Sequence, residues 1–571
     1  MTTAANPTQH FAVWPKRLPH RMNAPQNTLW ANLDITARRF ADKTAFVFFD
    51  RAISYRELHV EVELLAGWLQ KVAGVKRGDR VPICMQNSPQ FVIAYYAIMR
   101  TDAVVVPVNP MNKAAELGHY ITDPDSRVVI CSGEVAGEWI AANEALPAAQ
   151  RLQKILVTRY TDCMNEGAID AATTPAAWRT WLDLCPTLPA YATSWLDAMA
   201  QARASALRAD PPQAVPEDMV VLPYTSGTTG LPKGCIHTHQ TIMHNVAAGA
   251  AWGNATSETV NLAVVPMFHI TGMLYGLHGN IYLGSTSIIL PRWDRDLAGS
   301  LISRYRVSNW TMIPTMIIDL LGSPRVAEYD LTSLVYIGGG GAAMPQAVAE
   351  KLFKQFGLRF IEGYGLTETA APSHSNPPDS PKQQCLGVPY VSVDSRVINP
   401  DTLELCAVGV AGEIVMHGPQ IFKGYWKNRA ATEAAFIEIE GKSFFRSGDI
   451  GRVDEEGYFF MTDRLKRMIN ASGFKVWPAE VEALLFRHPA VQEACVISAH
   501  DAYRGETVKA VIVLRADARH TTEKDICDWA HDNMAAYKAP RVVEFVDALP
   551  KSGSGKVMWR ALQEKETVAK A

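Results

Sequence analysis

Apolar side chains recur at helical spacing early in the chain. Within residues 54–72 (SYRELHVEVELLAGWLQKV), Leu58, Val62, Leu65 and Leu69 follow one another at intervals of three or four. This spacing places them on one side of an α-helix and leaves the polar residues on the other. The segment is therefore predicted to be an amphipathic helix that packs on a core.

Short apolar runs without helical spacing alternate with stretches of this kind. They are VVVPVNP (104–110), RVVICS (127–132), KILVTR (154–159), STSIILP (285–291), SLVYIGGG (333–340) and LRFIEGYG (358–365). Such runs are typical of buried strands, and their alternation with helices favours parallel pairing. We expect α/β layers built on largely parallel sheets.

Two later regions differ from this pattern. Residues 160–215 are rich in Ala, Trp, Pro and Thr, and we interpret them as a helical excursion that ends in a proline-rich connector. Short strands of a more twisted β unit are predicted around Asp449, and a compact α+β pattern follows. We predict a large N-terminal domain, residues 1–463, with two parallel-type α/β subdomains and a small β unit. A small, mobile α+β domain, residues 464–571, completes the chain.

Composition narrows the class of protein. The chain has 571 residues, too many for one hydrophobic core, and its formal net charge of -3 gives no basic field for nucleic acid. Nine cysteines are scattered without a CxxC pair, which indicates reduced thiols. No secretory signal is recognisable at the N-terminus, and no run approaches the ~18 apolar residues of a membrane span. We expect a cytoplasmic protein with no transmembrane segment and no nucleic-acid partner.

The segment TSGTTGLPKG (225–234) is the first candidate for a ligand site. Its glycines permit close approach to the backbone, and its hydroxyls and Lys233 suit an anionic polyphosphate. Pro232 stands where the Walker A pattern requires glycine, so a P-loop NTPase is disfavoured. Taken alone, the segment is also compatible with a surface turn.

Three later segments carry complementary chemistry. In EGYGLTETA (362–370), a tyrosine between glycines could stack on a base, and a carboxylate beside a hydroxyl suits Mg²⁺ held against phosphates. In FFRSGDIG (444–451), Asp449 follows a tight turn and could accept hydrogen bonds from ribose hydroxyls. LPKSGSGKVMWR (549–560) is a glycine-rich loop that contains Lys556. Each segment alone is also compatible with a turn or a solvated lysine.

In this order, the four segments resemble those of the ANL superfamily of adenylating enzymes, which includes acyl- and aryl-CoA synthetases. The resemblance extends over roughly residues 28–562. It implies an ATP- and acyl-binding N-terminal domain, a mobile C-terminal domain, and ATP, Mg²⁺ and CoA as cofactors. It also implies a small-molecule carboxylic acid as substrate. The oligomeric state, monomer or homodimer, is left open.

The resemblance implies roles in nucleotide binding for two sets of residues. The phosphate-binding set is Thr225, Ser226, Gly227, Thr228, Thr229, Gly230 and Lys233. Around the nucleoside, Gly341 and Ala342 would border the adenine, Tyr364 would stack on it, and Asp449 and Arg464 would hold the ribose.

Further residues are implied in catalysis and in the second half-reaction. Thr367 would contact the α-phosphate, Glu368 would bind Mg²⁺, and Lys556 would be the adenylation lysine. The others are His269, which would line the acyl pocket, Lys466 as the hinge, and Gly473 at the pantetheine tunnel. Asn470 stands where several relatives have lysine, so no role for a charge is expected there.

The implied activity is that of an AMP-forming acid–CoA ligase, in which a carboxylate attacks the α-phosphorus of ATP and CoA then displaces AMP. The predicted acyl wall, with Met267, Met273 and Met312, is apolar and lacks a cation for a second carboxylate. An apolar acid is therefore favoured, because unpaired polar groups would be costly there. We predict a medium- or long-chain fatty acid, with an aryl or arylpropenoic acid as the alternative.

Other functions remain open at this stage. A peptide-synthetase adenylation module would need a carrier in trans, because only 15 residues follow Lys556. An acyl-AMP ligase that loads a carrier protein usually has an insertion near the domain junction, and none is evident around 449–475. A non-catalytic nucleotide sensor would have no need of Lys556.

Overall fold

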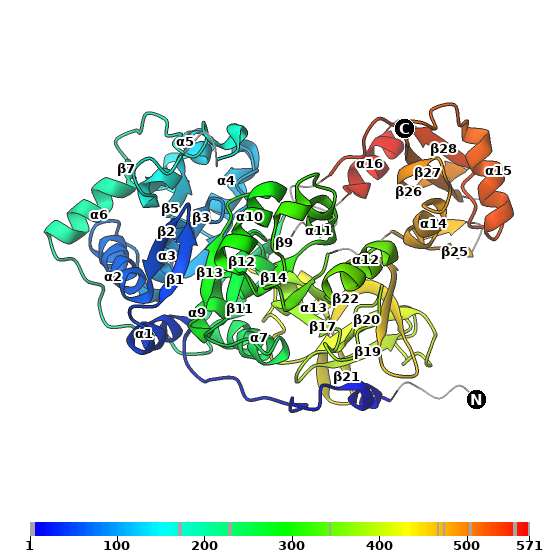
Figure 1. Cartoon of the computed structure of the whole chain (residues 1–571), viewed down its shortest axis with the longest axis horizontal. Helices are drawn as coiled ribbons and strands as arrows, with labels where there is room; N and C mark the ends of the chain where they lie inside the picture. The colour runs from blue at the N-terminus through cyan, green and yellow to red at the C-terminus, as the bar shows by residue number, and fades with distance from the viewer. Residues whose placement is uncertain are drawn as a thin grey trace. The chain divides into compact units, whose positions relative to one another are not determined.

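The computed structural model describes residues 6–169, 174–225, 231–341, 344–464, 467–471, 474–501, 505–551 and 557–568 (Figure 1). Contacts divide the chain into two compact units. The first comprises Met1–Gln9, Ser395–Val415 and Arg446–Ala571, and the second comprises His10–Asp394 and Met416–Phe445. The predicted domain boundary between residues 463 and 464 stays a prediction.

A seven-stranded sheet forms one layer of the second unit. Its order is β11 (His237–Thr238), β8 (Met219–Val221), β4 (Val104–Pro107), β3 (Arg80–Cys84), β5 (Val128–Ser132), β6 (Lys154–Thr158) and β7 (Ala192–Ser194). Every pair is parallel except β11 with β8. The predicted strands near residues 104, 127 and 154 are thus confirmed, while β7 arises inside the region interpreted as a helical excursion.

A nine-stranded sheet forms the other main layer of this unit. Its order is β18 (Val388–Pro389), β17 (Ala371–Ser375), β16 (Phe360–Leu366), β15 (Tyr336–Gly339), β14 (Asn309–Met312), β12 (Val260–Ala263), β13 (Thr286–Ile289), β1 (Thr44–Phe48) and β2 (Arg51–Ser54). Pairing is parallel from β16 through β1 and antiparallel at both ends. Together the two sheets confirm the mixed α/β class with largely parallel strands.

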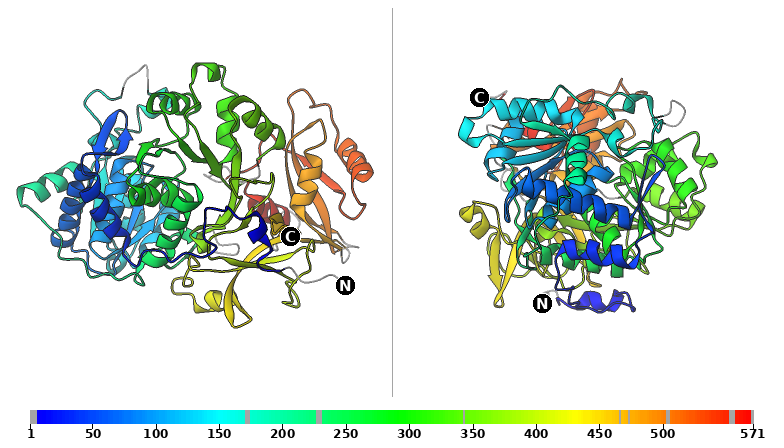
Figure 2. Two further views of the ribbon diagram at one scale, coloured as in Figure 1. Left: turned by 60° about the horizontal axis from the view of Figure 1, so that its bottom comes forward. Right: turned by 90° about the vertical axis from the view of Figure 1, so that its left-hand side faces the viewer.

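Helices connect and cover these strands (Figure 2). They are α1 (Leu29–Arg39), α2 (Tyr55–Lys71), α3 (Pro89–Arg100), α4 (Ala114–Thr122), α5 (Gly133–Ala145), α6 (Trp195–Ala204), α7 (His239–Trp252), α8 (Ile270–Gly272), α9 (Gly279–Leu283), α10 (Arg295–Tyr305), α11 (Pro314–Leu321), α12 (Gln346–Phe356) and α13 (Arg429–Ala434). A π-helix, Met273–His278, joins α8 to α9. The amphipathic helix predicted at 54–72 is α2, and α6 confirms a helix in the excursion.

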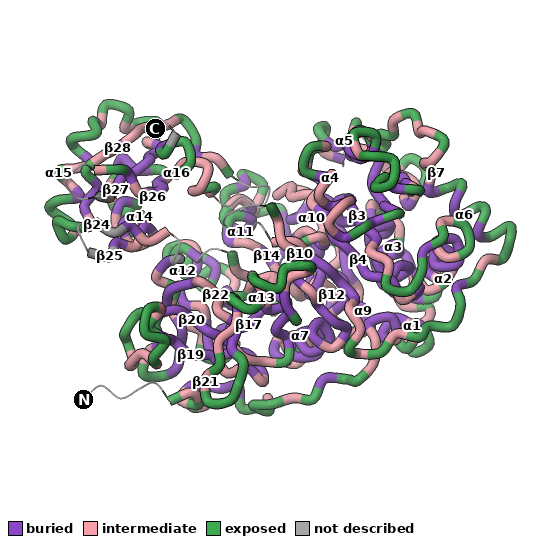
Figure 3. Tube along the Cα trace, turned by 180° about the vertical axis from the view of Figure 1, so that it is seen from behind, coloured by how far each residue is buried: buried purple, intermediate pink, exposed green. Residues whose placement is uncertain are grey.

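The core of the seven-stranded sheet follows the alternation of side chains along its strands. Val105 packs in the cluster that contains α2 and α3, whereas its neighbours Val104 and Val106 pack in the cluster that contains α4 and α5. Successive residues of a strand point to opposite faces, so helices cover both faces of this sheet. Figure 3 shows the buried residues concentrated along the strands.

Two smaller sheets lie wholly or partly in the first unit. One has the order β19 (Asp394–Ile398), β20 (Gly412–His417), β22 (Lys442–Val453) and β21 (Phe436–Ile439), with β23 (Phe459–Arg464) beside β22. In this sheet, β21 and the start of β22 are assigned to the second unit. The other has the order β25 (Phe474–Val476), β24 (Ile469–Ala471), β27 (Gly505–Leu514) and β26 (Val491–Asp501), with β28 (Val542–Phe545) beside β27. The helices here are α14 (Pro478–Leu485), α15 (Glu523–Asn533) and α16 (Trp559–Val568).

The C-terminal α+β segment has a hydrophobic core of its own. Ile469, Val481, Val508 and Ile526 belong to one cluster and come from β24, α14, β27 and α15. A separate core is what an independently folding domain requires. None of the helices in the described ranges is both long and apolar enough to cross a bilayer.

Candidate active site

The two described ends of the predicted phosphate loop are paired to each other. Lys233 in β10 (Lys233–Gly234) lies opposite Thr225 in β9 (Tyr224–Thr225) in an antiparallel register. At Gly234, a Cβ atom would lie 2.9 Å from the side chain of Leu222, so glycine lets this strand pack closely. Residues 226–230 of the loop, which include five predicted phosphate-binding positions, lie outside the described residues.

The strand that carries Lys233 lies against a distant segment of the chain. The Trp426 amide donates to the Gly234 carbonyl at 2.8 Å, and the Lys423 amide donates to the Ile236 carbonyl at 2.9 Å. This pairing places Tyr425 beside Lys233. The Lys233 ammonium lies 4.0 Å from the centroid of the Tyr425 ring, a cation–π contact.

Glu368 belongs to the same cluster. It lies in the 3₁₀ turn Thr367–Thr369, directly after β16. The Tyr425 hydroxyl donates to the Glu368 carboxylate at 2.8 Å, and the Phe422 amide donates to its main-chain carbonyl at 2.8 Å. The structure therefore brings together two predicted site residues, Lys233 and Glu368, through a tyrosine that sequence reasoning missed.

A buried histidine fixes the main chain of Thr367. His237 Nε2 donates to the Thr367 carbonyl at 2.7 Å, and its Nδ1 lies 3.1 Å from the Thr241 hydroxyl oxygen. Burial lowers the pKa of His237 to about 4, so the ring is neutral near neutral pH. A neutral ring with its proton on Nε2 makes the bond to the carbonyl without placing a charge in the core.

The residues predicted around adenine occupy closely packed strands. Tyr364 lies in β16, is 8% exposed, and has its ring 5.6 Å from that of His374. Gly341 follows β15 with a φ of +87°, and at Gly340 a Cβ would lie 2.2 Å from the Gly363 carbonyl oxygen. Glycine is therefore required for β15 and β16 to approach here. Ala342 lies outside the described residues.

The two predicted ribose-binding residues belong to the first unit. Asp449 in β22 lies directly opposite Arg464 in β23 in the antiparallel register. Asp449 is 1% exposed, and its amide donates to the Ser447 hydroxyl at 3.0 Å. The β-sheet thus places the two residues in register although the chain separates them by a turn. Lys466, Gly473 and Lys556 lie outside the described residues.

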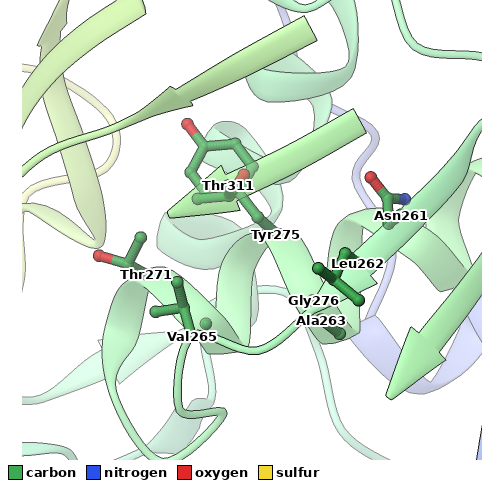
Figure 4. A pocket seen from close by; sticks show the side chains of 9 residues that line it. Asn261, Leu262, Ala263, Val265, Thr271, Tyr275, Gly276 and Thr311 are labelled. Atoms are coloured by element: carbon green, nitrogen blue, oxygen red, sulfur yellow. The ribbon is translucent and has the colours of Figure 1, made fainter. Parts of the chain in front are cut away.

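A small cavity is lined in part by residues of α8 (Figure 4). His269 is exposed at the N-cap of this helix, and its Nδ1 accepts a hydrogen bond from the amide of the lining residue Thr271 at 3.3 Å. The space between the lining atoms, about 260 Å³, includes open solvent, and a water-sized sphere can occupy only about 10 Å³ of it, room for roughly one water molecule. Its lining comes from β12, α8, the π-helix and β14: Asn261, Leu262, Ala263, Val265, Thr271, Gly272, Tyr275, Gly276 and Thr311.

The cavity lies on two of the segments predicted to form the acyl wall, but with other side chains. Met267, Met273 and Met312 are at most 1% exposed and do not line it. Met273 instead receives a hydrogen bond from the Tyr95 hydroxyl, 2.7 Å from its sulfur. In Figure 4, the hydroxyls of Thr271 and Tyr275 point in different directions. The lining of this cavity is more polar than the predicted acyl wall, which stays a prediction.

Oxygen ligands for a hard cation are available at Glu368, but no cage of ligands surrounds it. Within the described ranges, no group of three or more His, Cys, Asp or Glu side chains is placed to hold a metal. Mg²⁺ keeps several waters and is commonly bound by one or two carboxylates together with substrate phosphates, and Glu368 is a carboxylate in the position that the resemblance implies for a ligand of this ion.

Comparisons with known proteins agree with this geometry. Residues 33–426 match the AMP-binding enzyme family, and residues 480–556 match the AMP-binding enzyme C-terminal domain. The long-chain-fatty-acid–CoA ligase of Bacillus subtilis (strain 168) is 34% identical over 98% of both chains. The feruloyl-CoA synthase of an Amycolatopsis species is 33% identical over 91% of this chain and 96% of its own.

Solved structures give the same result. ATP-bound MatB from Rhodopseudomonas palustris superimposes with a TM-score of 0.81 at 27% identity, covering 96% of this chain and all of that one. The family model covers more than half of the sequence. Relatives that are more than 30% identical match the chain over nearly its whole length. The chain belongs to the AMP-binding enzyme family and, within it, to the AMP-forming acyl-CoA synthetases.

Proposed function

We propose that this acyl-CoA synthetase activates a medium- or long-chain fatty acid. The acid is joined to AMP with release of pyrophosphate, and CoA then displaces AMP to give the thioester. The observation that carries the proposal is the cluster of Lys233, Tyr425 and Glu368, which places a cation and a carboxylate beside the phosphate loop. The fatty-acid substrate is supported by the bacterial long-chain-fatty-acid–CoA ligases among the relatives.

The phosphates of ATP would be held by Thr225, Lys233 and the loop between them. Adenylation builds negative charge on the α-phosphate, and preorganised cations lower the barrier by stabilising that charge. Glu368 would hold Mg²⁺, which when bound neutralises phosphate charge. Lys556 is proposed to supply the remaining cation at the reacting carboxylate, in the mobile domain proposed at residues 464–571.

On the nucleoside side, Asp449 and Arg464 are proposed to hold the ribose, and Gly341 and Tyr364 to border the adenine. The acyl chain is proposed to bind in the region of the cavity whose lining residue Thr271 donates its amide hydrogen to His269. Lys466 as hinge and Gly473 at the CoA tunnel stay proposals that rest on the family resemblance. We place the reaction in the cytoplasm, because all nine cysteines are free thiols.

An aryl or arylpropenoic acid is the second candidate substrate. One observation favours it: three hydroxyl-bearing side chains, Thr271, Tyr275 and Thr311, line the cavity. A ring that carries a hydroxyl could pair with the two threonines, whereas the Tyr275 hydroxyl already has a hydrogen-bond partner in Tyr390. The 4-coumarate–CoA ligase 2 of rice is 31% identical over 90% of this chain.

The test is a pyrophosphate-release screen over acids of graded chain length and ring type, with and without CoA. We expect acid-dependent release with a fatty acid and thioester formation when CoA is added. Release that peaks with an aryl acid would replace the substrate assignment. Thioester formation only on a carrier protein would replace CoA as the acceptor. The Lys556→Ala variant should bind ATP but lose pyrophosphate release, and unchanged release would contradict the enzymatic role.

A further inference from the structure

Tyr425 touches two proposed nucleotide-site residues at once, and its position is fixed from several sides. Its amide donates to the Thr432 hydroxyl at 2.9 Å, and its main chain forms an antiparallel bridge with Cys235. The preceding Gly424 has a φ of +133°, and a Cβ there would lie 2.6 Å from the Thr432 methyl group. Only glycine fits this bend, which aims the tyrosine at the cluster.

The aromatic surroundings hold the ring itself. Phe422 packs edge-on against Tyr425 with 4.9 Å between centroids, and Phe436 stacks on Phe422. One face of the Tyr425 ring is left for the Lys233 ammonium, 4.0 Å from its centroid. Burial, followed by the nearby charge of Glu368, raises the pKa of the Tyr425 hydroxyl above its usual range, so it stays a hydrogen-bond donor.

The two contacts of Tyr425 reinforce each other electrostatically. A phenol that donates to a carboxylate becomes richer in electrons, and an electron-rich ring attracts an ammonium more strongly. The bond occupies Oε1 of Glu368 and fixes the rotation of the carboxylate, which determines where Oε2 points. The same ring contacts the Lys233 ammonium, which limits the rotamer entropy that the lysine loses when it binds an anion.

We propose that Tyr425 is a positioning residue that sets Glu368 for the divalent cation and Lys233 for the phosphates, and so links the two halves of the Mg²⁺–ATP site. This inference rests on the proposed function. The hydroxyl acts on the cation through the carboxylate, while the ring acts on the phosphates through the ammonium. The two contributions are therefore separable by substitution.

Two variants separate them. Tyr425→Phe keeps the ring and removes the donor, whereas Tyr425→Leu removes both. Tyr329→Phe is the matched control: the Tyr329 hydroxyl also donates to a carboxylate, that of Asp296, at 2.8 Å, and lies outside the proposed site. The measurement is calorimetric ATP binding, with the metal chelated and then across a Mg²⁺ titration, so that the readout does not depend on turnover.

We expect Tyr425→Phe to raise the Mg²⁺ concentration at half-saturation about three- to tenfold, less than the full worth of one hydrogen bond to a charged group, because the hydroxyl acts on the cation only through the carboxylate. Its metal-free ATP affinity should stay within about twofold of the wild type. Tyr425→Leu should show the same Mg²⁺ shift and also weaken metal-free ATP binding about two- to fivefold, the scale of an exposed cation–π contact. Tyr329→Phe should change neither quantity.

A Mg²⁺ half-saturation in Tyr425→Phe equal to that of Tyr329→Phe would overturn the proposal, as would equal metal-free affinities in the Phe and Leu variants. Circular dichroism of each variant identifies a misfolded protein. In that case Tyr425→Trp, which keeps a ring without the phenol, replaces the Phe variant, and Tyr425→Met, which has no ring, replaces the Leu variant. Failure of the proposed function gives a different result, because wild-type protein would then release no pyrophosphate with any acid.

Discussion

The phosphate-side cluster and the acyl cavity lie in the same compact unit but are built differently. The cluster joins Lys233, Tyr425 and Glu368 by charged contacts between segments that main-chain hydrogen bonds hold in place. The cavity is lined by neutral side chains of β12, α8, the π-helix and β14. Under the proposed function, charge chemistry in the cluster is common to any acid that the enzyme activates, whereas the cavity is proposed to select the acid. Substitutions in the two regions should therefore change different kinetic constants.

The largest effect is expected at Glu368. Glu368→Gln removes the negative charge while keeping the size, so adenylation should fall about 100-fold or more, the scale of losing one preorganised electrostatic group. The order of preference among acids should not change, because the cavity is untouched. Pyrophosphate release measured over several acids checks both statements. A changed acid preference in this variant would break the separation between the two regions.

Acidification should weaken the buried His237, which holds the main chain beside Glu368, before it affects the neutral side chains of the cavity. His237 has a pKa of about 4 when folded against about 6.5 when unfolded, so its contribution to stability is complete above about pH 6.5 and falls as the pH drops toward 4. Near pH 5 this residue alone should lower the free energy of unfolding by about 2 kcal/mol. Urea unfolding near pH 7 and pH 5 measures the difference.

The control for this prediction is His237→Gln, whose amide can still donate to the Thr367 carbonyl but does not titrate. Between pH 7 and pH 5, the free energy of unfolding of this variant should fall by about 2 kcal/mol less than that of the wild type. Other buried histidines, such as His278 and His374, titrate in both proteins, since burial lowers their pKa to about 3. Equal losses in both proteins would show that His237 is not held neutral.

Tyr275 should control the choice of acid. Its ring lines the cavity and packs on α7, where a Cβ at Gly249 would lie 3.3 Å from its Cε1 atom. Tyr275→Ala should lengthen the cavity toward α7 and shift the ratio of kcat/KM for longer over shorter acids by about ten- to 100-fold, since each accommodated methylene is worth about 1–3 kcal/mol. The KM for ATP should stay within about twofold. An unchanged chain-length profile would contradict this role.

The smallest effect is expected at Thr311. Thr311→Val keeps the shape of the cavity wall and removes one hydroxyl, which should favour alkyl over hydroxylated aryl acids about two- to tenfold, the worth of one neutral hydrogen bond. Competition between one acid of each kind measures this ratio directly. Thr332→Val, an exposed position bonded to Asp330, is the matched control and should leave the ratio unchanged.

The same contrast explains what the sequence could predict. The strand near 104 and helix α2 were predicted because their periodicity is a local property that the fold preserves. The chemistry of Lys233 and Glu368 was predicted because glycine-rich and acidic motifs are local too. Tyr425 was missed because its role depends on a contact with Glu368, 57 residues away, that only tertiary pairing creates.

The predicted acyl wall stays a prediction, and the cavity near it is lined by other side chains than the three predicted methionines. Residues 267–280 are apolar over most of their length, so the sequence could not show which side of the helix faces the cavity. The π-helix Met273–His278 changes the angular spacing of side chains locally, and Tyr275 and Gly276 face the cavity while Met273 enters the core. Packing decided this outcome, and no short motif records it.

The central claim is that the acid attacks the α-phosphorus of ATP in a site that contains Lys233 and Glu368. Its most direct test supplies an acid whose carboxylate is labelled with heavy oxygen, together with ATP, Mg²⁺ and CoA, followed by mass spectrometry of the nucleotide product. The account predicts AMP that carries one labelled oxygen, transferred when CoA cleaves the acyl-adenylate. ADP as the product, with the label in inorganic phosphate, would contradict it.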